Sequence, residues 1–283
     1  MKYKSLLCMS ALIAVLGCEE EKDAIVSSDG ISTEQMYASI ELVSAGNNQV
    51  IGNTQLTVLS PPRDNKSGDE YIELSASDRL WLSDSGSLDD ADIGEDVFSA
   101  LADIAQDFRL FDGRVSDRTE HIFFLFSHSV PNQIQYHSKT LEVEENAQLT
   151  VSLFRSSYTD AAESTVILPE DFTLDPLGDE PRFSRSRDII NLSWDTQEAD
   201  LKVEAESLVS CIGGEQRRER HEFGMDLGHI QFDVGQLEHR SLDGECETTI
   251  KVYRIRTGTL DDAFLDGVIT ASQVRAVNLV TIN

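Results

Sequence analysis

The sequence predicts an all-β protein built from two tandem β-sandwich domains. Short segments in which apolar and polar residues alternate recur from residue 35 to the end of the chain. Turn-forming residues separate these segments at a spacing of about 8–12 residues, which is typical of sandwiches. A segment over residues 161–182 contains Pro169, Pro176 and Pro181 and divides the pattern into two halves. We interpret it as a connection between the two domains.

The first domain is expected over residues 35–160. Residues 36–60 predict two strands joined by a turn at Gly46-Asn47-Asn48, and residues 141–156 predict two more around a turn at Glu145-Asn146. The run 120–129 contains four consecutive apolar residues, which is typical of a strand buried on both faces. Residues 89–108 form the one segment that the pattern assigns to a short helix.

The second domain is expected over residues 183–283, with Trp194 in its core. Its five strand candidates are residues 188–194, 201–211, 229–237, 246–258 and 273–282. Apolar residues dominate the odd positions of 201–211, which places Cys211 on the buried face, and Cys246 shares its parity with Ile250 and Val252. Antibody domains place the tryptophan between two cysteines, whereas Trp194 precedes both here. The pattern therefore supports an immunoglobulin-like or fibronectin-like sandwich and nothing narrower.

The N-terminus has the pattern of an export signal. Lys2 and Lys4 precede an apolar run of about a dozen residues, which is shorter than the roughly 20 residues that a membrane-spanning helix needs. The run ends in Val15-Leu16-Gly17-Cys18, followed by three glutamates. A plain signal peptide that happens to contain a cysteine is the alternative interpretation.

Val15-Leu16-Gly17-Cys18 resembles the lipobox of bacterial lipoproteins. The resemblance implies that residues 1–17 are removed and that Cys18 carries the lipid (diacylglycerol and an N-acyl chain such as palmitate). Residues 19–34 are polar and lack sustained periodicity, so we expect residues 18–34 to form a flexible tether. Several acyl chains give stable anchoring, whereas a single chain binds a membrane only marginally. Glu19 follows the cysteine, where aspartate marks retention in the inner membrane of Gram-negative bacteria. The resemblance thus implies the outer membrane, facing the periplasm or the cell exterior.

A second resemblance covers residues 164–283. The runs STVILPEDFTL, RDIINLSWD and GTLDDAFLDGVITASQVRAV, together with Cys211 and Cys246, resemble a group of uncharacterised bacterial lipoproteins. These motifs are structural and imply no activity or catalytic residue.

Cysteine usage agrees with export. Cys8 would leave with the signal and Cys18 would be lipidated, so Cys211 and Cys246 remain as a pair in a compartment that permits disulfides. A bridge that closes about 35 residues stabilises by roughly 3–4 kcal/mol in the chain-entropy model. The rival interpretation, a metal site, needs more ligands than two cysteines, and the neighbouring sequence offers none.

Charge limits the classes of partner. Loss of the two lysines of the signal takes the formal net charge from −28 to −30. Such a surface repels nucleic acid, so we expect no nucleic-acid partner. The expected partners are the membrane lipid, through acylated Cys18, and an envelope protein or polysaccharide.

No motif predicts a cofactor or a firm metal site. In HEFGMDLGH, Met225 occupies the position where a zinc-protease helix needs its second histidine. The densest acidic run, residues 84–96, offers calcium candidates, although such runs are more often solvated loops. These candidates are Asp89, Asp90, Asp92, Glu95 and Asp96.

Two functions follow from these observations. The first is a non-enzymatic, membrane-anchored lipoprotein that presents a structural or binding module in the bacterial envelope. The alternative is an envelope hydrolase or carbohydrate-active enzyme that uses two carboxylates about 5–10 Å apart. A concave site that holds a carboxylate with a raised pKa would favour the alternative.

Overall fold

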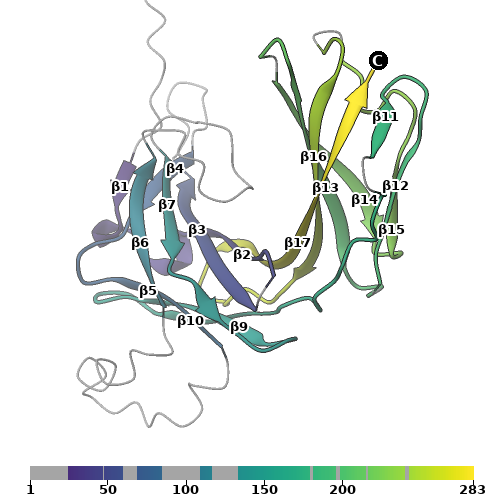
Figure 1. Cartoon of the computed structure of the whole chain (residues 1–283). Helices are drawn as coiled ribbons and strands as arrows, with labels where there is room; N and C mark the ends of the chain where they lie inside the picture. Colours follow the sequence, from purple (N-terminus) through teal and green to yellow (C-terminus); the bar gives the residue numbers. More distant parts are fainter. Residues whose placement is uncertain are drawn as a thin grey trace, which may run out of the picture.

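The computed structural model describes residues 25–46, 48–59, 69–84, 109–116, 133–178, 181–195, 198–214, 216–239 and 242–283. Within these ranges strands are the main regular structure, and the described residues otherwise contain two single 3₁₀ turns, η1 (Ser28–Gly30) and η2 (Thr33–Gln35). The strands form two tandem β-sandwiches, which confirms the predicted fold class (Figure 1). The helix expected over 89–108 and the strand over 120–129 lie outside the described residues.

In the part of the chain that the structure describes, no helix is long and apolar enough to cross a membrane.

The first sandwich packs two groups of strands around one apolar core. One group consists of β1 (Ile25–Ser27), β2 (Tyr37–Ser44), β3 (Gln49–Leu59), β4 (Asp69–Glu73), β6 (Arg109–Ser116), β7 (Gln133–Ser138) and β8 (Leu141–Glu142). The other consists of β5 (Arg79–Asp84), β9 (Gln148–Phe154) and β10 (Ala161–Ile167). Alternate residues of these strands, such as Ile40, Leu82 and Val151, fill the core between them. The turn predicted between β2 and β3 is confirmed, with Asn48 in the left-handed region.

Pairing of β5 with β6 joins the two groups on one side. On the other side, Thr165 of β10 forms an antiparallel bridge with Thr259, which belongs to neither group, and each residue donates its backbone N–H to the carbonyl of the other at 2.8 Å. A Cβ atom at Gly258 would collide with the Thr165 carbonyl oxygen. The bridge therefore requires glycine at position 258.

The second sandwich packs a long sheet against a two-stranded one. The long sheet contains β14 (Gln216–Met225), β13 (Lys202–Cys211), β16 (Cys246–Thr257) and β17 (Asp266–Ile282), with β11 (Arg182–Ser184) beside β17. The facing sheet pairs β12 (Ile190–Ser193) with β15 (His229–Phe232). Trp194 lies in the core between them, with its ring edge-on to Phe172 at 5.8 Å, which confirms its predicted role.

A buried ion pair forms part of this second core. Arg254 is fully buried, and its Nε donates to Asp226 Oδ2 at 2.7 Å. Asp226 also accepts from the indole N–H of Trp194 at 3.0 Å and from the backbone N–H of Gly228 at 2.9 Å. Because both charges are paired and hydrogen-bonded, the core tolerates them, whereas removal of one partner would strand the other.

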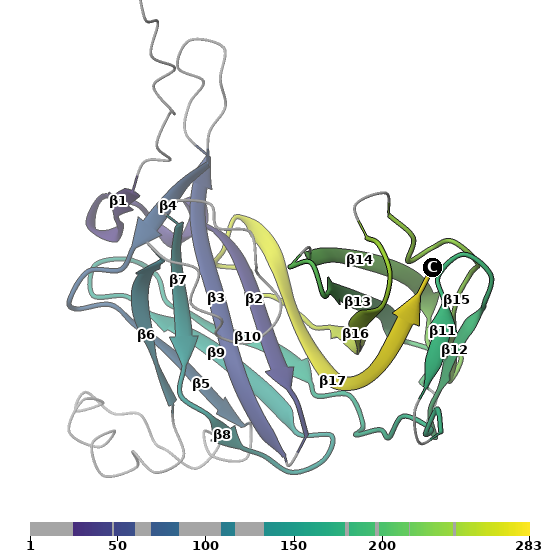
Figure 2. The same cartoon turned by 45° about the horizontal axis from the view of Figure 1, so that its top comes forward.

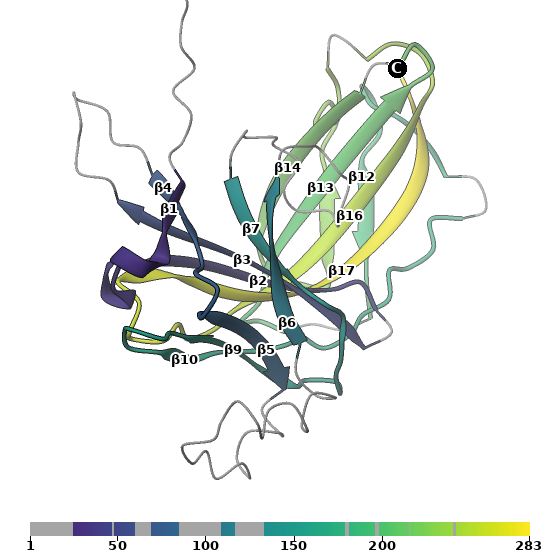
Figure 3. The same ribbon diagram turned by 90° about the vertical axis from the view of Figure 1, so that its left-hand side faces the viewer.

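β17 belongs to both sandwiches. Its first half, Asp266–Gln273, runs parallel to β2 and places Ile269 and Ala271 in the first core, while its second half places Leu279 in the second core. Figure 2 shows this strand curving from one sandwich into the other. The sheet is therefore continuous from β3 and β2 through β17 to β14 (Figure 3). The sequence predicted only residues 273–282 as a strand, because the partner of the first half lies near the other end of the chain.

The expected boundaries shift in two places. Residues 161–167 belong to the first sandwich as β10, which pairs with β9, so the connection expected over 161–182 begins later. Ala161, Ser164 and Val166 of β10 are buried in the fold. Residues 25–34, which we expected to continue the tether, form β1 and the two 3₁₀ turns. The parallel pairing of β1 with β4 holds this segment in the fold.

Candidate functional site

Of the site residues predicted from the sequence, the structure brings together one pair, the two cysteines of the second sandwich. Cys211 and Cys246 form a disulfide, as predicted, with their Cα atoms 4.0 Å apart. The lipidation candidate Cys18 lies outside the described residues, and so do the calcium candidates of the acidic run 84–96. Within the described ranges, no group of three or more His, Cys, Asp or Glu side chains is placed to hold a metal ion.

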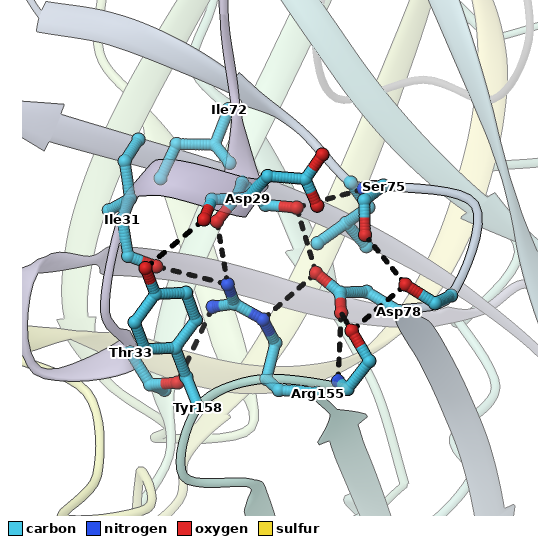
Figure 4. A network of polar contacts seen from close by, with 12 residues as sticks. Asp29, Ile31, Thr33, Ile72, Ser75, Asp78, Arg155 and Tyr158 are labelled. Carbon is cyan, nitrogen blue, oxygen red and sulfur yellow. Dashed lines mark hydrogen bonds and ion pairs between the residues drawn. The ribbon is translucent and has the colours of Figure 1, made fainter.

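A polar network fixes the N-terminal end of the first sandwich (Figure 4). Arg155, at the end of β9, pairs with Asp78 at 2.9 Å, and both side chains are almost fully buried. The same guanidinium donates to the carbonyl oxygens of Ser28 at 2.8 Å and Ile31 at 3.0 Å. Ser28 in turn donates its hydroxyl to Asp78 at 2.8 Å. The network thus ties η1 to the turns after β4 and β9.

Tyr158 covers this network from outside. Its ring lies 5.0 Å from the Arg155 guanidinium, and its hydroxyl donates to the Asp29 carbonyl at 3.1 Å. A stacked guanidinium and a paired carboxylate are stable only when their remaining atoms are hydrogen-bonded, as they are here. The first residues of the fold are therefore rigidly attached at the point where the chain arrives from its N-terminus.

A second polar cluster lies where the two sandwiches meet. β2, β17, β16, β13 and β14 share a sheet face that is turned away from both main cores, and we call this the junction face. Its buried centre is apolar: Val43, Tyr253 and Val274 pack together, with Ile255 beside them. The pairing register places Ser272 between Val43 and Ile255, in the row of residues next to that of Tyr253 and Val274. Its charged members are Glu41, Lys202, Glu204, Glu206, Arg218, Arg220, Glu222 and Lys251.

Glu41 is the most perturbed acid on the junction face. Burial raises the pKa of its carboxyl to about 7, while Arg220 acts to lower it and Glu204 adds to the rise. Among the described residues, its buried Oε2 atom has no hydrogen-bond partner, and neither has the hydroxyl of Ser272. Glu41 therefore changes charge near neutral pH, which an ordinary surface glutamate does not do.

The neighbouring acids are paired with cations. Glu204 contacts Lys202 at 2.8 Å and also Arg220, while Glu206 lies 3.7 Å from Lys251. Burial acts to raise the pKa of Glu204, but Lys202 and Arg220 lower it overall. Burial lowers the pKa of Lys251, which Glu206 opposes.

The junction face thus holds two carboxyls whose pKa values are shifted in opposite directions. Glu41 keeps a proton to about pH 7, whereas Glu204 stays ionised. Environments that push two pKa values apart are the physical basis of acid and base roles in carboxylate enzymes. Glu204, however, is already neutralised by two cations, so it is not free to act as a base.

Sequence reasoning did not find this site. Glu41 alternates with the core residues Ile40 and Leu42, which predicts only that it faces away from the first core. Two of the charges that act on its pKa, Arg220 and Glu204, lie on strands of the other sandwich, and the sequence contains no local signal for this arrangement. Arg155 and Arg254 also lie in ordinary strand segments, and nothing nearby marks them as buried.

Comparison with known proteins adds little to this picture. No protein-family model matches the chain, and no curated protein sequence matches it. Among solved structures, the chain is similar to one titled DIP-gamma IG1+IG2, at 8% identity and a TM-score of 0.22, which covers 88% of this chain and 98% of that one. It is also similar to chicken CNTN1 FN1-FN3 domains, at 10% identity and a TM-score of 0.25, over 93% of this chain and 69% of that one. Scores this low carry no argument, so the fold class rests on the strand order and the two cores.

Proposed function

We propose that this chain is a non-enzymatic lipoprotein of the bacterial envelope, held in the outer membrane by acylated Cys18 and presenting two fused sandwiches to a partner. The observation that carries the proposal is the short distance along the chain between the lipobox-like motif and the fold. Six residues, 19–24, separate Cys18 from β1. A flexible coil of that length would have a typical reach of about 12–15 Å. The module would therefore lie close to the membrane, nearer than the 20–25 Å or so that a 16-residue tether gives.

Two features of the fold suit presentation from an anchor. The Arg155 network attaches the first turns of the fold to the body of the first sandwich. A force transmitted from the anchor through the N-terminus would therefore be resisted by a buried ion pair and its hydrogen bonds. β17 then makes the two sandwiches one continuous sheet. A rigid pair of sandwiches on a short tether keeps a fixed surface at a fixed height above the lipid.

The contact surface that we propose is β14. In the described part of the chain this strand pairs only with β13, so its other edge is open, and most of its ten residues are exposed or half-buried. An open edge accepts an extended segment of another protein by backbone hydrogen bonds. Arg217 and Arg220 of this strand are cationic groups in a strongly acidic chain, paired with Glu219 and Glu204, and an acidic segment of a partner would compete for them. An envelope protein with an extended acidic segment is the partner that fits these features, with an anionic polysaccharide as the second choice.

Fractionation of cells tests the anchor. Wild type, Cys18→Ser and the control Cys8→Ser, which changes the other cysteine of the signal, are compared. The proposal expects wild type and Cys8→Ser in the outer-membrane fraction and Cys18→Ser in the soluble fraction or retained as precursor. An outer-membrane location for Cys18→Ser would refute lipid anchoring through this residue.

Photo-crosslinking tests the contact surface. A photoreactive residue at Arg217, on the open edge, is compared with one at Ser39, an exposed position of β2. A defined adduct at Arg217 that is absent at Ser39 supports the edge; an adduct at Ser39 alone contradicts it.

The carboxylate enzyme is kept as a second candidate because Glu41 has a raised pKa. A hydrolase would lose its activity on envelope polysaccharide in Glu41→Gln, whereas a binding module would keep its crosslinks. The two functions therefore differ in the response to one conservative substitution.

A further inference from the structure

The disulfide joins neighbouring strands of one sheet. Cys211 and Cys246 are directly opposite in the antiparallel pairing of β13 with β16, at the end of a ladder of ten residue pairs that starts at Lys202. The other nine pairs keep the strands together whether or not the sulfurs are bonded. Cleavage of this bond therefore leaves the sheet in place, unlike cleavage of a bridge between two layers.

Arg185 lies against one of the two sulfurs. Its Nη1 atom donates to Cys246 Sγ at 3.2 Å and to the Thr281 hydroxyl at 2.9 Å, and its Nη2 atom donates to the Gly244 carbonyl at 3.1 Å. The residue is 2% exposed, and within the described ranges its Nε atom has no hydrogen-bond partner. Among the described residues no carboxylate lies within ion-pair distance of it, and the acids that act on its charge, Glu238 and Asp243, do so from farther away. A buried cation without a directly contacting carboxylate is unusual.

The two sulfurs differ in their surroundings. Cys246 is 1% exposed and has the guanidinium beside it, whereas Cys211 is 7% exposed and adjoins the turn at Ile212, which is 90% exposed. A thiolate that forms at Cys246 would lie in hydrogen-bond contact with the Arg185 guanidinium, and a positive neighbour at that distance favours the thiolate over the thiol. Although both residues are buried, we expect an attacking thiol to reach Cys211 before Cys246, because Cys211 is the more exposed of the two.

We propose that the Cys211–Cys246 bond is a site of directed thiol–disulfide exchange, at which an external dithiol attacks Cys211 and Cys246 leaves as a thiolate held by Arg185. In the first step the attacking thiolate bonds to Cys211 Sγ, and the electron pair of the broken S–S bond stays on Cys246. In the second step the other thiol of the reagent gives up its proton and displaces Cys211, which takes up a proton. The protein gains two electrons, and the dithiol leaves as a disulfide.

The first test is the rate of reduction of the folded protein by dithiothreitol. Arg185→Met is expected to react about tenfold more slowly than wild type, because the leaving thiolate loses its partner. Arg185→Lys keeps a positive charge and should react faster than Arg185→Met. Arg187→Met, which changes an exposed arginine two residues away, is the matched control and should match wild type. Equal rates for wild type and Arg185→Met would overturn the proposal.

Two further measurements keep the proposal testable if Arg185→Met does not fold. In Cys211→Ser, absorbance of the Cys246 thiolate near 240 nm is followed against pH, and we expect a midpoint below the ordinary value of about 8.5. A midpoint at or above that value contradicts the role of Arg185. Brief exposure of wild type to glutathione, followed by acid quenching and peptide mapping, should place the mixed disulfide on Cys211. An adduct found mainly on Cys246 would refute the direction of attack.

Discussion

Replacement of Glu41 by glutamine should change how the stability of the protein depends on pH. The pKa of this carboxyl rises from 4.5 to about 7 on folding, because burial disfavours its charge. A group whose pKa is raised in the folded state contributes stability that is fully present below pH 4.5 and is lost as pH rises through about 7. At 1.36 kcal/mol per unit, the loss for wild type amounts to about 3 kcal/mol. Glutamine has no charge to bury and therefore avoids this loss.

Urea unfolding of wild type and Glu41→Gln at pH 5, 6, 7 and 8 measures the effect. We expect the stability of the variant relative to wild type to increase with pH by about 2–3 kcal/mol between pH 5 and pH 8, with most of the increase below pH 7. Glu247→Gln changes an exposed carboxylate of β16 and serves as the matched control. A difference between Glu41→Gln and wild type that is constant over this range would refute the account of the junction face.

Three other substitutions test the packing of the fold, each by urea unfolding at constant pH. Arg155→Met should cost about 3–5 kcal/mol because Asp78 is left charged and buried, whereas Arg182→Met, which breaks an exposed ion pair, should cost under about 1 kcal/mol; similar losses would contradict the buried pair. Gly258→Ala should cost about 1–3 kcal/mol through its collision with the Thr165 carbonyl, and an unchanged stability would disprove that contact. Replacement of both bridge cysteines by serine should lower the unfolding free energy by about 3–4 kcal/mol, as removal of a cross-link over 35 residues predicts, and no loss would argue against the bridge.

Local patterns predicted the features that depend on local rules. The parity of Cys211 within its strand indicated its buried face, and Trp194 was identified as a core residue, because alternation and size act within a few residues. The β2–β3 turn was recognised from Gly46 and its neighbours for the same reason. The number of sandwiches also followed from strand spacing and from the proline-containing segment.

The features that were missed depend on contacts between distant segments. The first half of β17 becomes a strand by pairing with β2, and β10 extends the first sandwich because it pairs with β9 and bridges to Thr259. The pKa of Glu41, which lies in the first sandwich, also depends on the second sandwich, because Arg220 and Glu204 of that sandwich act on its charge. No periodicity within a single segment contains this information.

Intact mass spectrometry of the protein purified from the membrane fraction tests the central claim most directly. The account predicts a mature chain that begins at Cys18 and carries the added mass of its acyl chains, and it predicts that Cys18→Ser loses both features. A soluble wild-type protein with an unmodified mass and a cleavage site elsewhere would contradict it. In that case residues 18–24 would not be an anchor, and a freely secreted binding protein or enzyme would replace the anchored module.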